Sequence, residues 1–467
     1  MALTDGVTLV QAPADWQILQ QDGAGVADLP LTGRWAAEDR RDCRVFVRLV
    51  RSADAAPVAA HLDWTAAETR ADGTWSLTLP RIPAGGLYRV ETHLRTDKEP
   101  CSEWAIHGEA RDFLGVGDLW VIAGQSNAAG YGKGPCDDAP ELGIHLFGND
   151  RRWRLARQPL ADGSGADRRE AINCEWANPG HAPWLAFAKR LRRDLGHPIG
   201  LIATALGGSP LSRWNPGEHA DPAQADLCAC MLRAVAQAGG RVRGMVWYQG
   251  CSDTGPGKAS TYLARFTTAV AAWRAALGDP ALPIITVQLD RVTAPQTPEV
   301  HDGWSQVREA QRQAARRLAG VAVVPASDLP LSDLIHVSPA GNLVLGARAA
   351  EAALALVHGC DLAWRAPEVE SARRGEDGAS IHLEVAHVAG RLRPADASGQ
   401  PFTVSDADGA VGIVGIDHPS QGVVLRLARS LSGAATVSGG AGAHPPLLPV
   451  DMTRNLPLLC FHRLPVA

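Results

Sequence analysis

The chain has 467 residues, of which 46% are apolar and 20% are charged, and its formal net charge is -5. A chain of this length exceeds a single hydrophobic core and predicts roughly two to four domains. The weakly acidic balance gives no basic patch, which argues against nucleic acid or an anionic membrane surface as a partner.

The first 115 residues consist of short β-type runs separated by turns. The runs "CRVFVRLV", "GTWSLTLP" and "GGLYRVETHL" are rich in β-branched and aromatic residues and are bounded by Gly, Pro and Asp. No helical period runs through this part. We therefore expect residues 1–115 to form an N-terminal β-sandwich domain.

Residues 116–362 alternate between apolar runs and amphipathic segments. This alternation predicts an α/β domain with a three-layer, doubly wound parallel sheet covered by helices on both faces. The expected strands are 118–124, 199–206, 244–250, 283–289 and 321–326, and the expected helices lie near 182–195, 222–238, 258–276, 303–318 and 338–356. The segment 131–180 has little periodicity, which is typical of a functional loop region.

The last hundred residues return to β-type patterns. The runs "ASIHLEVAHV", "QPFTVSD" and "GVVLRLA" predict a second small β domain over residues 363–467. The expected architecture is thus an α/β domain flanked by two β-sandwich-type domains.

The sequence also bears on compartment, membranes and cofactors. No apolar run looks long enough to span a bilayer. The start "MALTDGVTLVQAPADW" lacks the pattern of a secretory signal. We therefore expect a cytoplasmic location by default, with a periplasmic or secreted one open if the numbering belongs to a trimmed chain. The nine cysteines, an odd number, are widely spaced and suggest no disulfide framework. We expect no metal and no cofactor.

Small polar residues follow several of the expected strands. "GQSN" places Ser126 and Asn127 after the first strand, "GGS" places Gly208 after the second, and "QGCSD" begins at Gln249 after the third. "SDLIHVSPAG" lies near the end of the α/β region, with Asp333 three residues before His336. Because the carboxyl ends of parallel strands meet at one edge of the sheet, these groups are expected to share a site.

These residue types are the ones that acyl transfer requires. A serine hydroxyl becomes a nucleophile when an imidazole removes its proton, and a carboxylate holds that imidazole in the right tautomer. The oxyanion of the tetrahedral intermediate needs fixed N–H donors, which a glycine turn and a side-chain amide such as Gln249 can supply. A phosphate-binding loop and a nucleophile elbow both fail, because Asn127, Ala128 and Gly134 stand where those motifs need other residues.

The ordered set "GQSN", "GGS", "WYQG" and "DLIH" resembles the SGNH-hydrolase superfamily, and more closely its sialate O-acetylesterase and carbohydrate acetylesterase branch. The resemblance implies a serine esterase that removes O-acetyl groups from a carbohydrate through an acyl-enzyme. It implies Ser126 as nucleophile, His336 as general base and Asp333 as the group that orients it. The oxyanion hole would consist of the N–H groups of Ser126 and Gly208, with Gln249 as a further donor.

Three further residues are expected to bind an acetylated sugar or glycan, which is the predicted partner. They are Asn127, Arg213 and Trp214, the last by stacking on a sugar ring. One residue departs from the family pattern, since Cys251 stands where glutamate is usual. A thiol cannot replace a carboxylate as an acceptor, so the support of the site differs here, and Asp253 is a candidate to compensate.

Two alternatives stay open at this point. One is a non-catalytic glycan-binding protein on an esterase scaffold, and the other is an esterase of non-carbohydrate acyl esters. The retained spacing of Ser126, Asp333 and His336 favours catalysis. The sequence does not define the oligomeric state.

Overall fold

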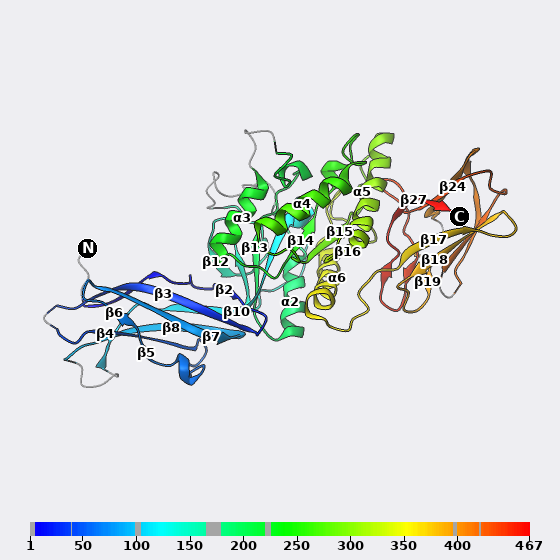
Figure 1. Ribbon diagram of the computed structural model, residues 1–467. Coiled ribbons are helices and arrows are strands. Elements are labelled where there is room, and N and C mark those ends of the chain that lie inside the picture. Colours follow the sequence, from blue (N-terminus) through cyan, green and yellow to red (C-terminus); the bar gives the residue numbers. More distant parts are fainter. Residues whose placement is uncertain are drawn as a thin grey trace.

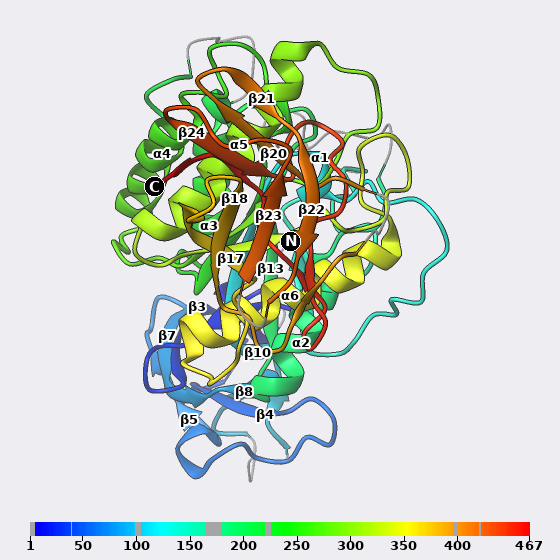
Figure 2. The ribbon, with the colours of Figure 1, turned by 90° about the vertical axis from the view of Figure 1, so that its right-hand side faces the viewer.

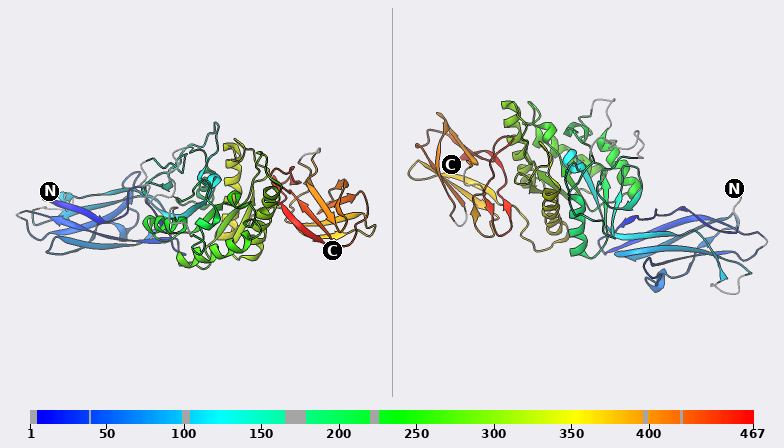
Figure 3. Two further views of the ribbon diagram at one scale, coloured as in Figure 1. Left: turned by 90° about the horizontal axis from the view of Figure 1, so that it is seen from above. Right: turned by 180° about the vertical axis from the view of Figure 1, so that it is seen from behind.

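The computed structural model describes residues 5–38, 40–98, 104–164, 179–219, 226–395, 399–419 and 422–467. The molecule is a row of three parts, with β-rich parts at both ends and the helices in the middle (Figure 1). The same row is seen from above and from behind (Figure 3), and the two termini lie in opposite end parts. The fold is mixed α/β with large sheets.

The N-terminal part is built from strands, as predicted. One sheet has the order β1-β3-β7-β6, and a second group of strands pairs through β4 and β8. Alternate residues of these strands are buried and share one apolar core, which contains Leu31, Val47 and Trp75. The strands in chain order are β1 (Gly6–Gln11), β2 (Ile18–Gln20), β3 (Val26–Ala36), β4 (Arg44–Arg51), β5 (Thr65–Ala66), β6 (Glu68–Thr69), β7 (Thr74–Pro83), β8 (Gly85–Arg95) and β9 (Ile106–His107).

One long strand, β10 (Arg111–Gly124), joins this part to the centre. Its first residues pair antiparallel with β8. From Asp118 onward it pairs in parallel with two central strands, β13 (Ile199–Ala203) and β14 (Gly244–Tyr248). The boundary expected between residues 115 and 116 therefore falls inside a continuous strand, and a shared backbone ladder connects the two parts.

The central sheet has the order β12-β11-β13-β10-β14-β15-β16. All its neighbouring pairs are parallel except β11 with β12. All five expected strands are present, although several end earlier than predicted. Their polar last residues belong to the loops beyond the sheet. The strands after β10 are β11 (Ile144–Phe147), β12 (Trp153–Leu155), β13 (Ile199–Ala203), β14 (Gly244–Tyr248), β15 (Ile284–Gln288) and β16 (Val321–Pro325).

Two of these strands lie in the segment 131–180, for which only loop structure was expected. Both β11 and β12 are very short, so neither contains enough residues to display a period. The stretch 165–178 of that segment lies outside the described residues.

Five longer helices pack against the sheet. They are α2 (Trp184–Leu195), α3 (Leu227–Ala238), α4 (Tyr262–Ala276), α5 (Pro298–Arg317) and α6 (Pro339–His358). Helix α2 packs on α6, and α4 packs on α5. Helix α5 begins five residues before its predicted start, because the Thr297 hydroxyl caps it and Pro298 occupies the first turn. Residues 222–225, the expected start of α3, lie outside the described residues.

Helix α6 corrects one expectation from the sequence. By length and composition, it alone among the helices that the structure describes is long and apolar enough to cross a membrane. It packs against α2, β15 and β16, and 11 of its residues are buried. Its apolar residues thus make the packing contacts of a core helix.

The C-terminal part is again made of strands, as predicted, and lies in front of the helices when the molecule is viewed along its length (Figure 2). Its main sheet has the order β21-β20-β24-β27-β17-β18-β23-β22, and β19-β25-β26 form a small second sheet. The strands are β17 (Glu368–Arg374), β18 (Ser380–Ala386), β19 (Leu392–Arg393), β20 (Phe402–Asp406), β21 (Gly409–Val411), β22 (Ile413–Asp417), β23 (Gly422–Leu427), β24 (Ala435–Gly439), β25 (Val450–Asp451), β26 (Leu456–Pro457) and β27 (Phe461–Val466).

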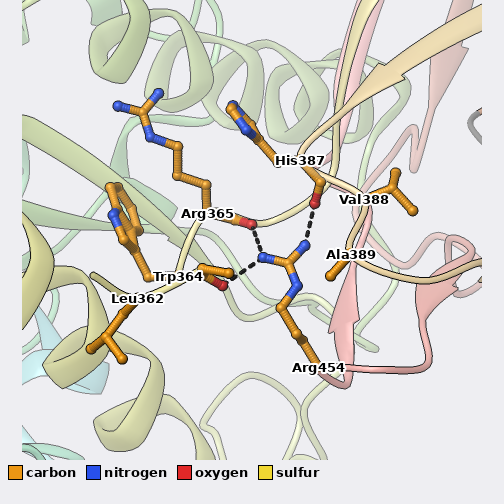
Figure 4. Close-up of a pocket in the computed structure, with 8 residues that line it drawn as sticks. Leu362, Trp364, Arg365, His387, Val388, Ala389 and Arg454 are labelled. Carbon is orange, nitrogen blue, oxygen red and sulfur yellow. Dashed lines mark hydrogen bonds between the residues drawn. The ribbon is translucent and has the colours of Figure 1, made fainter. Parts of the chain in front are cut away.

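A single arginine ties the segment after α6 to this C-terminal part. The Arg454 guanidinium donates to the carbonyl oxygens of Ala363, Arg365 and His387, as Figure 4 shows. It also forms an ion pair with the buried Asp451 carboxylate at 2.9 Å. The pocket that Arg454 lines contains none of the predicted site residues. These contacts belong to the junction of the two parts, to which the Arg312–Glu368 ion pair also contributes.

Candidate active site

The nucleophile candidate lies where β10 stops. Gly124 has a φ of +127°, and a Cβ there would lie 2.3 Å from the Tyr248 carbonyl oxygen, so glycine is required. The chain then turns into α1 (Ser126–Ala129), with Gln125 as its N-cap residue. Ser126 is therefore the first residue of a short helix at the carboxyl edge of the sheet, and 7% of its surface is exposed.

The predicted acid and base form a compact loop. The His336 ring nitrogen Nδ1 lies 2.7 Å from Asp333 Oδ2. Asp333 Oδ1 also accepts the backbone N–H groups of Ile335 and His336. Partial burial opposes ionisation of Asp333, but these hydrogen bonds outweigh it and hold the pKa of the carboxyl below its usual value. Asp333 is thus an ionised partner for the imidazole, and Nε2 remains the nitrogen directed elsewhere.

Asn127 brings the serine and the histidine loop together. Its Nδ2 donates to the Ile335 carbonyl oxygen at 3.1 Å, and its Oδ1 accepts the Val337 N–H at 3.0 Å. The residue next to Ser126 therefore holds the backbone on both sides of His336. Within the described part of the chain, no hydrogen bond joins Ser126 Oγ to the imidazole; such bonds often tighten only when substrate binds.

The role expected for Asn127 is therefore corrected. The side chain is buried, and the groups that use its amide belong to the protein itself. Both N–H groups of the amide are used within the protein, and its oxygen is buried. Asn127 holds the site together.

Tyr131 is a site residue that the sequence did not single out. Its ring lies over the His336 ring, with 5.0 Å between the centroids and a tilt of 51°. It follows α1 after Gly130, whose φ of +99° turns the chain back toward the histidine. An isolated tyrosine in an aperiodic segment carries no sequence signal of such a contact.

Two backbone N–H groups at this edge are available as donors. Gly208 is exposed, has a φ of +65°, and has no atom near the position of a Cβ. The N–H groups of Gly208 and Ser126 donate to no acceptor among the described residues. Unpaired donors at a helix N-terminus and a glycine turn are suited to an anionic oxygen.

Gln249 does not fill the oxyanion role expected for it. Its side chain is fully buried, and its Nε2 donates to the Ser209 carbonyl oxygen at 3.2 Å and to Asp253 Oδ2 at 2.6 Å. Its Oε1 accepts the Tyr262 hydroxyl. Gln249 therefore has no donor left for a substrate, and it braces the turn that carries Gly208.

Trp214 likewise belongs to the support of this turn. It is fully buried, its ring meets Trp247 edge-on at 5.3 Å, and its indole N–H donates to Ser209 Oγ. The expected stacking on a sugar is wrong because no ring face is open. Arg213 lies in the short 3₁₀ turn Leu211–Arg213 after Gly208 and is partly exposed, and its role toward substrate stays a prediction.

A buried carboxyl beneath the site was also missed. Asp290 follows β15 and is fully buried, and its Oδ2 accepts Asn127 Nδ2 at 3.2 Å. Burial raises the pKa of Asp290 to about 8. Burial and the nearby Asp290 raise the pKa of the Cys251 thiol well above its usual range. The only available sequence signal was an aspartate directly after a predicted strand.

Asp253 does not take the place of the missing glutamate at position 251. Its carboxylate pairs with Arg265 at 2.9 Å and accepts the Leu211 N–H and Gln249 Nε2. The hydrogen bonds of Asp253 therefore hold the turn that contains Gly208. Within the described ranges, no group of three or more His, Cys, Asp or Glu residues is arranged to hold a metal ion.

The chain is similar to several known proteins. A probable carbohydrate esterase of Arabidopsis thaliana is 29% identical over 260 residues, which are 50% of this chain and 90% of that protein. Human sialate O-acetylesterase is 26% identical over 211 residues, and the match spans 38% of each chain. The crystal structure of a carbohydrate acetylesterase from Xanthomonas citri is 23% identical, with a TM-score of 0.67 over 97% of this chain and 99% of that one, and shares the fold.

A family model provides the assignment. The model of the carbohydrate esterase, sialic acid-specific acetylesterase family matches residues 116–355, which is just over half of the chain and includes every predicted site residue. The chain therefore belongs to this carbohydrate esterase family and is a carboxylic ester hydrolase.

Proposed function

We propose that the protein is a serine esterase that removes O-acetyl groups from a carbohydrate, with Ser126, His336 and Asp333 as its catalytic residues. The observation that carries the proposal is the pair of Asn127 hydrogen bonds to residues 335 and 337. They place the loop of the base beside the residue that follows Ser126. The Asp333–His336 contact at 2.7 Å supports the same assignment.

The reaction has two halves. Ser126 Oγ attacks the acetyl carbonyl carbon while His336 Nε2 takes the hydroxyl proton, and Asp333 stabilises the imidazolium. The sugar oxygen then leaves with that proton, and an acetyl-serine remains. Water attacks the acetyl-serine with His336 again as base, and acetate is released.

The oxyanion is assigned to backbone donors. The N–H groups of Ser126 and Gly208 are free to donate to the carbonyl oxygen as it becomes negative. One donor of this kind typically contributes about 10²–10³ in rate. Gln249 and Asp253 act on this step indirectly, because they hold the turn that presents Gly208.

The substrate and the fold type belong to the same proposal. The relatives' names favour an acetylated sugar, and a sialate ester is the first candidate. The order β13-β10-β14-β15-β16 corresponds to 2-1-3-4-5 in chain order, which supports a three-layer doubly wound fold of the SGNH type. The separate apolar cores of the two end parts support β-sandwich-type domains at 1–115 and 363–467 around a catalytic domain at 116–362.

The decisive experiment replaces the nucleophile. We expect Ser126→Ala to lower kcat for an aryl acetate by at least ~10³-fold, since the acyl-enzyme cannot form. The matched control Ser371→Ala, on a strand of the C-terminal part where this serine is half-buried, keeps wild-type turnover. An organophosphonate probe labels the wild type and not Ser126→Ala.

Two results would count against the proposal. Wild-type turnover by Ser126→Ala would exclude the serine mechanism. Glycan binding without turnover of any acetyl ester by the wild type would instead favour a binding protein. A panel of O-acetylated sugars and simple acyl esters then separates a carbohydrate esterase from a general one.

A further inference from the structure

We propose that Asp290 is a positioning residue for His336, acting through the side-chain amide of Asn127. The proposal rests on the function proposed above. It concerns a residue outside the predicted triad, at the end of a different strand from the one that carries Ser126. Its carboxyl lies under the site and has no path to the substrate except through Asn127.

The first argument is the orientation of the Asn127 amide. Nδ2 donates both to Asp290 Oδ2 at 3.2 Å and to the Ile335 carbonyl oxygen at 3.1 Å, while Oδ1 accepts the Val337 N–H. Rotating the amide by half a turn would place its oxygen against two acceptors and its N–H groups against a donor. The Asp290 acceptor therefore helps to select the one orientation that holds residues 335 and 337.

The second argument is that stability does not explain this carboxyl. Asp290 is fully buried, and among the described residues its carboxyl forms no ion pair. Its Oδ1 forms no hydrogen bond with the described residues, although the Tyr248 hydroxyl lies close to the carboxyl. A buried carboxyl without an ion pair costs folding free energy that an apolar side chain would avoid. A residue kept at such a cost is expected to serve the site.

The groups around Asp290 explain the protonation state of its carboxyl. The Arg308 guanidinium lies nearby but donates to the carbonyl oxygens of Leu289, Asp290 and Gly442, not to the carboxyl. The Tyr248 hydroxyl and the Cys251 thiol also lie near the carboxyl, and the charge of Arg291 acts on it. With its pKa raised to about 8 by burial, the carboxyl is mostly neutral at pH 7 and retains a carbonyl oxygen for Asn127.

This chemistry predicts a difference between two substitutions. Asp290→Asn keeps a neutral carbonyl acceptor of the same shape, and the unpaired Tyr248 hydroxyl oxygen is close enough to take the added N–H. Asp290→Leu keeps the branched shape and the number of heavy atoms but removes the acceptor. We expect kcat of Asp290→Asn to stay within ~3-fold of wild type, and kcat of Asp290→Leu to fall by at least ~10-fold with KM within ~2-fold.

The experiment measures kcat and KM for an aryl acetate and, separately, the hydrogen exchange of the Val337 amide. That amide donates to Asn127 Oδ1, so Asp290→Leu should accelerate its exchange at least ~10-fold, whereas Asp290→Asn should not. The matched control is Gln288→Leu, which removes another buried polar side chain, at the last residue of β15, two positions before Asp290. Gln288 contacts Arg308 and Cys460, so this variant keeps wild-type kcat.

Three outcomes would overturn the proposal: a kcat of Asp290→Leu within ~2-fold of wild type, equal losses in Asp290→Asn and Asp290→Leu, or an effect confined to KM. If Asp290→Leu does not fold, Asp290→Ala replaces it, and kcat is referred to the number of Ser126 hydroxyls that the phosphonate labels at completion. If the wild type hydrolyses no ester, the proposed function fails. The Val337 exchange then still decides whether Asp290 orders the loop.

Discussion

Two buried aspartates at opposite ends of the parallel sheet behave in opposite ways. Asp118 lies where β10 enters the parallel sheet and accepts hydrogen bonds from Arg243 at 2.8 Å, Gln21 at 3.0 Å and His197 at 3.0 Å. Burial alone would raise its pKa, but these partners hold the pKa well below the usual value. Asp290 lies beyond the far end of β15 and is equally buried, yet burial dominates and raises its pKa to about 8.

The difference shows that hydrogen-bond and ion-pair partners determine whether the pKa of a buried carboxyl rises or falls. At the amino end of the sheet, the Asp118 carboxylate pairs with Arg243, and Gln21 links the N-terminal part to it. At the carboxyl end, Asp253 is likewise paired with Arg265, whereas Asp290 accepts the neutral Asn127 amide and forms no ion pair among the described residues. The hydrogen bonds of Asp118 stabilise the fold at the first end. Asp290 lies at the second end, where the proposed reaction develops charge.

The first prediction concerns the paired aspartate, Asp118. Asp118→Ala should lower the free energy of unfolding by about 3 kcal/mol, because it leaves Arg243 without its buried partner. Asp290→Asn should not lower it, since a neutral side chain replaces a neutral one. Urea unfolding of both variants at pH 7 measures the contrast. Equal destabilisation by the two substitutions would contradict the distinction drawn between the two ends.

The second prediction is that Asp118 and Asp290 affect the pH dependence of stability in opposite ways. Asp118 has a lowered folded pKa, so its contribution is present above the ordinary value of 3.8 and is lost as the pH falls below it. Asp290 has a raised folded pKa, so the unfolded chain ionises first and stability falls as the pH rises from 3.8 to about 8.

The slope attributable to Asp290 is at most about 1.4 kcal/mol per pH unit. Unfolding titrations of the wild type against Asp290→Asn isolate this term, because the variant lacks the ionisation. Tyr248, Cys251, Arg308 and Arg291 surround the carboxyl and are unchanged in both proteins. A constant difference in stability between pH 5 and pH 8 would refute the assignment.

The smallest expected effect tests the corrected role of Trp214. Trp214→Phe removes the indole N–H that donates to Ser209 and some volume from the core. We expect a loss of about 1–2 kcal/mol in the free energy of unfolding and an unchanged KM for an acetylated sugar. A large rise in KM with unchanged stability would restore the sugar-stacking interpretation.

Much of the fold was predictable because it depends on local pattern. The apolar runs at 118–124 and 321–326 predicted strands, and the pattern near 338–356 predicted α6. The loop with Asp333 and His336 was predictable for the same reason, since a spacing of three residues lets one turn hold both groups. The strands β11 and β12 are too short to show a hydrophobic period, so they were not predicted.

Several site roles were not predictable because they depend on where side chains point. Gln249, Trp214 and Asn127 follow strands whose ends meet at the site, yet all three side chains are turned into the protein. A motif gives a residue's position at the sheet edge. It does not say which hydrogen-bond partners compete for that residue.

The sequence by itself determined the order of elements, the polar residues at the strand ends and the acid–base pair, because each of these depends on neighbours within a few positions. Only the tertiary structure decided that Asn127 joins the serine to the histidine loop. It also decided that Asp290 lies beneath them, bonded to Asn127 and without an ion pair among the described residues. Those contacts link residues 163 to 210 positions apart. Their energies come from burial and from partners that no local pattern contains.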